Sequence, residues 1–229
     1  MEIVSPLPGT EPSRDCLRCP RLVAFRRQCR VDHPDWWNAP VYAFGDPDGW
    51  LAFAGLAPGK HGANRTGRPF TGDHAGDLLF ATLAEFGLSE GIYDARPDDG
   101  LRLRGAIIVN SVKCLPPRNK PTPAEIANCR PFFERQLAAL PNLRVIVALG
   151  RIAHDAALRA AGARLAAYPF AHGAVHALAD RRYLVDSYHC SRYNMNTGRL
   201  TPAMFADVFR TALVLRDQTS GRNSSTTAR

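Results

Sequence analysis

The sequence predicts an α/β domain, doubly wound or three-layered, in which helices cover both faces of a parallel sheet. Four short runs along the chain are apolar throughout instead of alternating, which is typical of strands that are buried on both faces. Amphipathic stretches of helical period separate these runs, and such alternation is typical of β-α-β units. The chain of 229 residues is short enough for a single hydrophobic core to fill it.

The predicted strands all carry β-branched or aromatic residues. They are LAFAG at residues 51–55, AIIVN at 106–110, RVIVAL at 144–149 and YLVDS at 183–187. The predicted helices span residues 77–86, 123–140, 152–161 and 202–215. The second helix has the clearest start, because Thr122 suits an N-cap, Pro123 the first turn and Glu125 an early acidic position.

We expect one domain from residue 15 to residue 215, with a flexible arm at residues 1–14 and a polar, disordered tail at residues 216–229. The first residues lack a positively charged segment ahead of an apolar run, so they do not resemble a secretory signal. No apolar stretch has the length of a membrane span, and six cysteines are too few for a secreted disulfide scaffold. We therefore expect a cytoplasmic monomer that makes no membrane contact.

The charge of the chain is positive. Lysine and arginine total 29 against 21 acidic residues, which gives a net charge of +8, and all but three of the basic residues are arginines. A compact basic domain favours a partner rich in phosphate, although charge alone does not identify that partner. A GC-rich coding sequence explains the excess of arginine equally well.

A glycine-rich loop follows the first predicted strand, at the edge where ligands of parallel sheets bind. Residues 55–73 do not match a nucleoside triphosphate loop, because the glycine–lysine spacing is one residue too short and His61 replaces the magnesium-binding hydroxyl residue. No nucleotide cofactor is therefore expected. Backbone amides, Arg65 and Arg68 instead suit a phosphodiester, and Phe70 suits a stacked base. As an alternative, Phe70 anchors the loop in the core.

Polar side chains also follow the neighbouring strands. Asn110 closes the second strand and Asp73 ends the glycine-rich loop, so an amide and an acid come to the same edge of the sheet. An amide at this place can read the edge of a base, or it can form a turn or cap. The fourth strand is followed by His189, Ser191, Arg192 and Asn194. Ser191 lacks the G-x-S-x-G surroundings of a hydrolase nucleophile, whereas the position of His189 favours a functional role.

Four of the six cysteines have the spacing of a metal site. They are Cys16 and Cys19 in a CxxC pair, and Cys114 and Cys129 in a distant segment. Such a set can hold zinc or an iron–sulfur cluster, and spacing does not distinguish the two. A thioredoxin-like pair is disfavoured because this CxxC does not follow a strand, and scattered structural thiols are the remaining alternative. The other two cysteines, Cys29 and Cys190, are expected to be free thiols.

Five segments are specific enough to compare with known families. They are FGDP at residues 44–47, GLAPG at 55–59, HGANRTGRPFTGD at 61–73, NSVKCLPP at 110–117 and YHCSRYNMNTGRLTP at 188–202. Together they resemble the uracil-DNA glycosylase superfamily and, within it, the family 5 class of iron–sulfur enzymes. The resemblance implies a three-layer α/β/α sandwich around a four-stranded parallel sheet, in agreement with the strand pattern.

The resemblance also implies a DNA repair glycosylase, which flips a deaminated base out of the duplex and hydrolyses its N-glycosidic bond to leave an abasic site. The implied partner is DNA that contains uracil, with hypoxanthine or etheno-adducts as further substrates. The residues that match ligands of a structural [4Fe-4S] cluster are Cys16, Cys19, Cys114 and Cys129. The alternatives are a noncatalytic nucleic-acid-binding domain with a four-cysteine metal site, and a hydrolase of free nucleosides or nucleotides.

The resemblance assigns roles to residues at the strand ends. The matching catalytic residues are Asp73, Asn110 and His189, and the matching base-binding residues are Gly55, Ala57, Phe70, Asn110 and His189. The matching DNA-binding residues are Arg65, Arg68, Ser191, Arg192 and Asn194. Related classes position water with an acid or amide in the first motif, but Leu56 and Ala57 are apolar here, as in family 5. Asp73 is therefore expected to orient water or stabilise the positive sugar, and His189 to donate to uracil O2.

Overall fold

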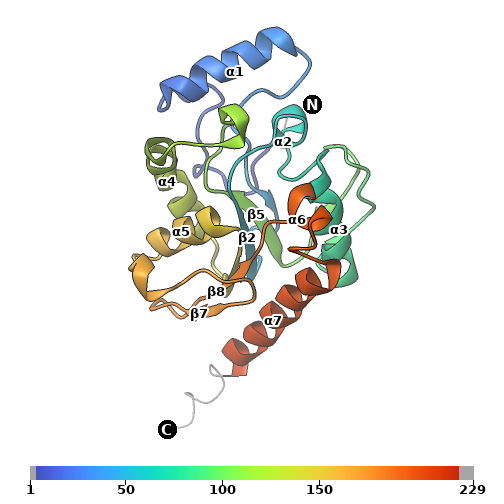
Figure 1. Ribbon diagram of the computed structural model, residues 1–229, viewed down its shortest axis with the longest axis vertical. Helices are drawn as coiled ribbons and strands as arrows, with labels where there is room; N and C mark the ends of the chain where they lie inside the picture. The colour runs from blue at the N-terminus through green and yellow to red at the C-terminus, as the bar shows by residue number, and fades with distance from the viewer. Residues whose placement is uncertain (1–3, 222–229) are drawn as a thin grey trace.

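The computed structural model describes residues 4–221, except for the side chains of residues 219–221, and has a six-stranded sheet at its centre (Figure 1). Four strands run parallel in the order β5-β2-β6-β8. Their bounds are Leu51–Gly55 for β2, Ala106–Asn110 for β5, Val145–Leu149 for β6 and Tyr183–Ser187 for β8. The predicted four-stranded parallel sheet is confirmed, and each strand begins and ends within one residue of its predicted bounds.

Two short strands that were not predicted extend this sheet at its edges. β1 (Phe44–Gly45) pairs with β5, and β7 (Val175–Ala177) pairs with β8, both in antiparallel orientation. A separate two-stranded sheet consists of β3 (Ser89–Glu90) and β4 (Arg102–Leu103). Strands of two or three residues are too short to leave a hydrophobic period in the sequence, so the pattern could not predict them.

Helices cover both faces of the large sheet, which confirms the three-layer sandwich (Figure 1). Their bounds are α1 Pro20–Asp32, α2 Ala63–Thr66, α3 His74–Glu85, α4 Pro123–Ala138, α5 Arg151–Ala160, α6 Arg192–Asn196 and α7 Pro202–Gly221. Two 3₁₀ turns, Pro117–Asn119 and Leu165–Ala167, lie between them. Helices α3 and α7 pack on one face of the sheet, and α4 and α5 pack on the other. The four predicted helices correspond to α3, α4, α5 and α7, whereas α1, α2 and α6 were not predicted.

Helix α4 begins where the sequence predicts. Thr122 Oγ1 accepts a hydrogen bond of 3.2 Å from the backbone N–H of Glu125, and Glu125 Oε2 accepts one of 2.8 Å from the backbone N–H of Thr122. This reciprocal capping box satisfies backbone N–H groups at the N-terminus of α4 that would otherwise lack partners. The Glu125 carboxylate also accepts two hydrogen bonds from Arg21, which ties α1 to α4.

Two predictions about the ends of the chain are wrong. Residues 4–14 do not form a free arm, because Leu7 is only 4% exposed and Glu11 Oε1 accepts a hydrogen bond of 2.7 Å from the backbone N–H of Ala43. Residues 216–221 are not a disordered tail, because α7 continues through them. The remaining residues of the two predicted segments, 1–3 and 222–229, lie outside the described part of the chain. Within residues 4–221 no helix combines the length and the apolar character that crossing a membrane requires.

Candidate functional site

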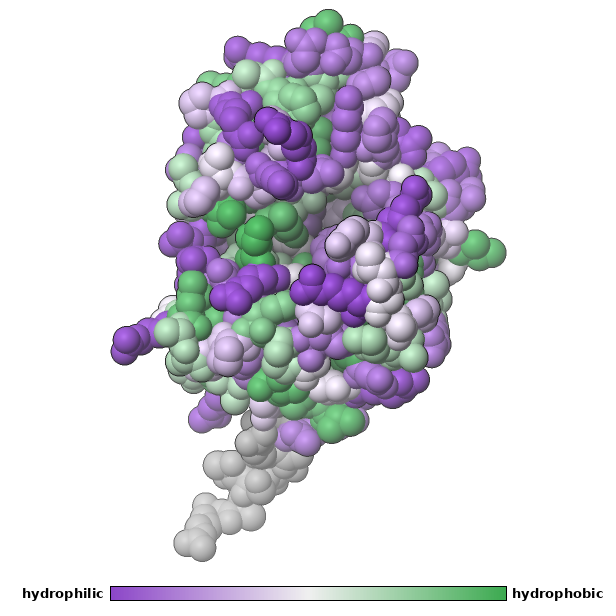
Figure 2. All heavy atoms as spheres, viewed as in Figure 1, coloured by the Kyte–Doolittle hydropathy of each residue, from purple (hydrophilic) through white to green (hydrophobic). Residues whose placement is uncertain are grey.

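Most of the residues predicted to act in catalysis, base binding or DNA binding converge around a cleft of about 500 Å³ at the carboxyl ends of β2 and β5 and beyond β8. In Figure 2, hydrophilic side chains surround a hollow on the face of the molecule that is shown. The predicted residues that line the cleft are Ala57, Phe70, Asp73, Asn110, His189, Ser191 and Arg192. The predicted residues that do not line it are Gly55, Arg65, Arg68 and Asn194.

Gly55 is a spacer behind the cleft. It pairs in register with Asn110 on the neighbouring strand. A Cβ atom on Gly55 would lie 2.3 Å from Asn110 Oδ1 and 3.1 Å from the Phe70 ring, so only glycine leaves room for both side chains. Phe70 has a φ of +54°, a conformation that costs a non-glycine residue about 1–3 kcal/mol and persists only where the surroundings enforce it.

Asn110 and His189 present polar atoms to the cleft that the chain does not pair. Asn110 is buried at the end of β5, yet its side-chain amide has no hydrogen-bond partner within residues 4–221. The His189 ring stacks on Phe70, with the ring centroids 5.9 Å apart and the planes inclined by 25°. Burial lowers the pKa of His189 to about 4, and neither ring nitrogen has a partner in the same range of residues. The imidazole is therefore neutral at pH 7 and has one N–H to donate.

Helix α6 holds the loop that carries His189. Ser191 is the N-cap of this helix, and its Oγ accepts a hydrogen bond of 3.4 Å from the backbone N–H of Asn194. Asn194 Nδ2 in turn donates a hydrogen bond of 2.8 Å to the backbone oxygen of His189. Both side chains thus fix the backbone after β8, a role that the sequence did not predict for them.

Asp73 ends the glycine-rich loop and caps α3, where its Oδ1 accepts a hydrogen bond of 3.2 Å from the backbone N–H of Gly76. Its Oδ2 lies against Gly59 and Gly62, since Cβ atoms on these glycines would be 3.1 and 2.3 Å from it. Burial raises the pKa of Asp73 despite the backbone hydrogen bonds that lower it, and this carboxylate forms no ion pair within residues 4–221. A desolvated, unpaired carboxylate can stabilise a developing positive charge or orient a water molecule.

Two predicted DNA-binding arginines have exposed side chains. Arg192 lines the cleft at the start of α6. Arg65 lies in α2, where its Nε donates a hydrogen bond of 2.8 Å to the backbone oxygen of His61. Each guanidinium keeps further donors that point to no protein acceptor among the described residues, so each can contact a phosphate.

The prediction that Arg68 binds DNA is wrong. Arg68 is only 4% exposed, and its two terminal nitrogens donate hydrogen bonds of 2.7 and 2.6 Å to the two carboxylate oxygens of Asp99. Burial alone would raise the pKa of Asp99, but the hydrogen bonds from Arg68, those from the backbone N–H groups of Asp94 and Leu101, and the charge of Arg68 together outweigh burial and lower it to about 2. The guanidinium also lies 5.0 Å from the Phe44 ring. Arg68 therefore braces the loop from the inside and is not available to a phosphate.

The four predicted metal ligands line one small cavity between the start of α1 and α4. They are Cys16, Cys19, Cys114 and Cys129. Three N–H groups approach their sulfurs: the Lys113 backbone at 3.3 Å from Cys129, Arg26 at 3.5 Å from Cys114, and Asn128 at 3.8 Å from Cys19. Burial raises the pKa of the Cys114 thiol to about 12, so without a cation these sulfurs stay protonated.

The arrangement of these sulfurs bears on what they can hold. A single tetrahedral zinc ion at about 2.3 Å from each sulfur needs sulfurs about 3.8 Å apart. Within residues 4–221, however, no three of the four sulfurs lie within 4.8 Å of one another. The buried Arg26 Nε also lacks a partner in this part of the chain, and its charge lies beside the cavity. The donor set fits an anionic centre that is larger than one ion.

Among the further residues that line the cleft, four polar or charged ones were not predicted as site residues: Lys60, His61, His74 and Asn119. Lys60 precedes and His61 begins the segment HGANRTGRPFTGD at residues 61–73, which was compared with known families, so a signal for both was present. Asn119 lies in the 3₁₀ turn Pro117–Asn119 with a φ of +56°. Only the folding of this turn over the cleft brings Asn119 to the site.

Comparison with known proteins gives one consistent result. A sequence model of the uracil DNA glycosylase superfamily matches residues 42–213. The chain is 48% identical over 202 residues to a type-5 uracil-DNA glycosylase from Thermus thermophilus, covering 86% of this chain and 92% of the relative. It is 44% identical over 206 residues to the type-5 enzyme of Mycobacterium bovis, with coverage of 86% and 76%. For the type-5 enzyme of Pyrobaculum aerophilum, identity is 43% over 202 residues, with coverage of 86% and 88%.

Proposed function

The chain belongs to the uracil-DNA glycosylase superfamily, and on this basis we propose that it removes uracil from DNA by hydrolysing the N-glycosidic bond. One observation within the cleft supports this proposal most. An aromatic ring, a base-reading amide, a neutral imidazole and an unpaired carboxylate meet in one cavity, on Phe70, Asn110, His189 and Asp73. These are the groups that binding and expelling a flipped pyrimidine requires.

Base recognition follows from the first two groups. The Phe70 ring lines the cleft, where a flipped base can stack on it. The Asn110 amide carries both a donor and an acceptor, which match the edge of uracil at N3–H and O4. Because Gly55 has no side chain, these two groups reach the same small space.

His189 stabilises the leaving group. When the bond between C1′ and N1 breaks, its electron pair passes to the uracil ring, and negative charge develops at O2. A neutral imidazole donates a hydrogen bond to this oxygen and carries no charge that must be desolvated in the cleft. The low pKa of His189 keeps the ring in this neutral form. Donors of this kind contribute about 10²–10³-fold in rate.

Asp73 acts on the sugar. Bond cleavage leaves positive charge on C1′ and the ring oxygen, and a carboxylate that has no other cation stabilises that charge. A water molecule then adds to C1′ and loses a proton, which yields the abasic sugar, while the uracil anion takes up a proton from solvent. With apolar Leu56 and Ala57 in the first motif, Asp73 is the acidic side chain that lines the cleft.

The exposed arginines bind the DNA backbone. Arg192 at the rim of the cleft and Arg65 in α2 supply positive charge to phosphates on either side of the flipped nucleotide. Ser191 and Asn194 support this contact by holding α6 in place. We further propose that the enzyme acts as a monomer in the cytoplasm.

The four cysteines hold a [4Fe-4S] cluster in this proposal. The cluster supplies a covalent link between the segment that precedes α1 and the segment around α4. The Lys113 N–H and the Arg26 guanidinium donate hydrogen bonds to its cysteine ligands. Anaerobically purified protein should be brown and contain four iron atoms and four sulfides per chain. A colourless protein with one zinc ion per chain would contradict this assignment.

The activity is tested with matched oligonucleotides that carry uracil, hypoxanthine or an etheno-adduct, as single and double strands. After incubation, hot alkali cleaves the strand at each abasic site. Scission at uracil supports the glycosylase, and scission at the other bases extends its substrates to them. Binding without scission would instead identify a noncatalytic nucleic-acid-binding domain.

A further inference from the structure

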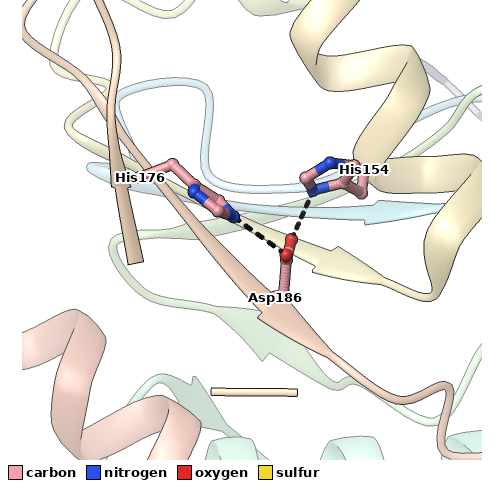
Figure 3. A group of neighbouring side chains, drawn as sticks. All are labelled: His154, His176 and Asp186. Carbon is pink, nitrogen blue, oxygen red and sulfur yellow. Dashed lines mark hydrogen bonds and ion pairs between the residues drawn. The ribbon is translucent and has the colours of Figure 1, made fainter. Parts of the chain in front are cut away.

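A second cluster of titratable side chains lies outside the base cleft, on the face of the sheet that α5 covers. His154 of α5, His176 of β7 and Asp186 of β8 point toward one another (Figure 3). His154 and Asp186 are buried, and the side chain of His176 is 11% exposed. One ligand atom from each lies within 4.8 Å of the other two, and no other group within residues 4–221 has three such atoms so close.

Asp186 connects the two rings. Its Oδ1 lies 2.7 Å from His154 Nδ1, and its Oδ2 lies 3.1 Å from His176 Nε2. The other nitrogen of His154, Nε2, lies 2.9 Å from the backbone oxygen of Tyr168, so it must carry the proton of that hydrogen bond. Metal-binding histidines are held in this way, with one N–H donated to a carbonyl and the opposite nitrogen directed at the ion.

We propose that His154 Nδ1, His176 Nε2 and the Asp186 carboxylate form a binding site for a divalent transition-metal ion such as Zn²⁺. Two imidazoles and one carboxylate are the donors that zinc and similar ions prefer. In the metal-free protein, protons bridge the rings to Asp186. The ion replaces these protons, and the negative charge of Asp186 then compensates part of its double charge.

The surroundings suit an ion that enters from the edge of the sheet. His176 lies on the edge strand β7 and is the least buried of the three ligands. Because the His176 side chain is 11% exposed, water can reach this ligand and complete the coordination. The ring of Phe170 packs edge-on against His154, and the ring of Tyr168 packs edge-on against His176.

Such an ion would stabilise β8, the strand that leads to His189 in the base cleft. It would join α5 and the edge strand β7 to β8, and Asp186 precedes His189 by three residues. The three ligands come from α5, β7 and β8, and their ligand atoms already lie within 4.8 Å of one another. The site is separate from the four cysteines and from the cleft, so its occupancy can be measured without reference to the glycosylase reaction.

The experiment uses the complete protein with its cysteine centre intact, freed of loosely bound metal and then titrated with Co²⁺. A difference spectrum against the untreated protein should show ligand-field bands that saturate at one Co²⁺ per chain, without the sulfur-to-cobalt charge transfer that cysteine ligation produces. Zn²⁺ should abolish these bands. Absence of the bands in the unmodified protein would overturn the proposal without reference to any variant.

A matched pair of variants locates the ion. His176→Gln removes a ligand from the edge strand, whereas His33→Gln removes a histidine that stacks on Trp36 far from this cluster in the fold. Equilibrium dialysis against Zn²⁺, followed by elemental analysis, should give one zinc per chain in the unmodified protein and in His33→Gln. In His176→Gln the affinity should fall by at least about tenfold. Equal zinc binding by both variants would show that the His154, His176 and Asp186 cluster is a hydrogen-bond network only.

Discussion

The base cleft and the framework beside it, by which we mean the loop that the Arg68–Asp99 pair holds together, differ in whether their polar groups have partners within the chain. In the framework, Arg68 meets both oxygens of Asp99. In the cleft, the amide of Asn110 and the ring nitrogens of His189 have no partner within residues 4–221. Because Asn110 and His189 line the cleft, these unpaired atoms are available to a ligand.

His189 and His154, both near the carboxyl end of β8, show how strongly the surroundings determine the pKa of a histidine. Burial lowers the pKa of His189 to about 4, because no acceptor compensates for it. Burial acts on His154 in the same direction, but the hydrogen bond and charge of Asp186 outweigh it and raise the pKa of His154. The first ring is neutral at pH 7 and has no partner among the described residues, and the second is a partner of a carboxylate.

The comparison predicts its largest effect in the framework. Asp99→Asn leaves the charge of Arg68 buried without its counter-ion, which should lower the free energy of unfolding at pH 7 by about 3–5 kcal/mol. Urea denaturation measures this loss. The matched change Asp207→Asn, at an exposed pair with Arg210, should cost less than about 1 kcal/mol. A loss at Asp99 as small as that at Asp207 would contradict the structural role of the pair.

The same pair predicts a pH dependence with a definite sign. The pKa of Asp99 is about 2 in the folded protein, below the 3.8 of an unpaired aspartate. A depressed folded pKa stabilises the fold above the unfolded value, and this contribution is lost as the pH falls through the folded pKa. The difference in unfolding free energy between the unmodified protein and Asp99→Asn should therefore shrink between pH 4 and pH 2. A difference that stays constant over this range would show that Arg68 does not hold the Asp99 charge.

The second prediction concerns the unpaired ring in the cleft. His189→Ala should slow uracil release in single-turnover assays by about 10²–10³-fold, the contribution of a donor to a developing anion. Because His189 has no hydrogen-bond partner of its own side chain to leave unpaired, its removal should destabilise the fold far less than Asp99→Asn does. His33→Ala serves as the control and should leave the rate unchanged. A rate for His189→Ala within threefold of the unmodified enzyme would remove His189 from the mechanism.

The third prediction separates the charge of Asp73 from its capping role. Asn caps helices about as well as Asp, so Asp73→Asn should keep α3 and lose only the negative charge. The rate should fall by about 10- to 100-fold, which corresponds to about 1.4–2.7 kcal/mol. Circular dichroism checks that the helix remains. If Asp73→Asn kept full activity, the carboxylate would be a cap and no more.

Asp73 also sets the acid limb of the pH–rate profile in this mechanism. Its raised pKa means that the carboxylate is protonated at a higher pH than an ordinary aspartate, and protonation removes the charge that stabilises the sugar. The rate should therefore decline as the pH falls through a value above 3.8, while His189 remains neutral down to about pH 4. Asp73→Asn should abolish this decline, and a profile that is the same in both proteins would assign the limb to another group.

The sequence predicted those parts of the fold and site that depend on local pattern. The strand of residues 106–110 is apolar at four of its five positions and begins and ends as predicted, because burial on both faces leaves a continuous signal. The polar residues at the strand ends were predicted together for the same reason, since parallel strands bring their carboxyl ends to one edge. The resemblance then supplied the roles that pattern cannot.

What the sequence could not predict depends on contacts between distant segments. Arg65 and Arg68 lie three residues apart in one basic loop, yet one is exposed and the other is paired with Asp99, 31 residues away. The sequence also did not predict the cluster of His154, His176 and Asp186, because only the packing of α5, β7 and β8 brings these residues together. Residues 1–14 were expected to be a flexible arm, but Leu7 is buried and Glu11 accepts a hydrogen bond from the distant Ala43.

The smallest predicted effect concerns Arg192, the exposed arginine at the rim of the cleft. Arg192→Ala removes the phosphate contact that we propose at the rim of the cleft, so the salt dependence of DNA binding should lose about one unit of slope in log K against log salt. Arg159→Ala on α5 removes an exposed arginine far from the cleft and should leave the slope unchanged. Titrations with a non-cleavable oligonucleotide at several salt concentrations provide the measurement. Equal slopes for both variants would mean that exposure alone does not identify a DNA contact. The phosphate backbone of the DNA would then pass over another part of the protein surface.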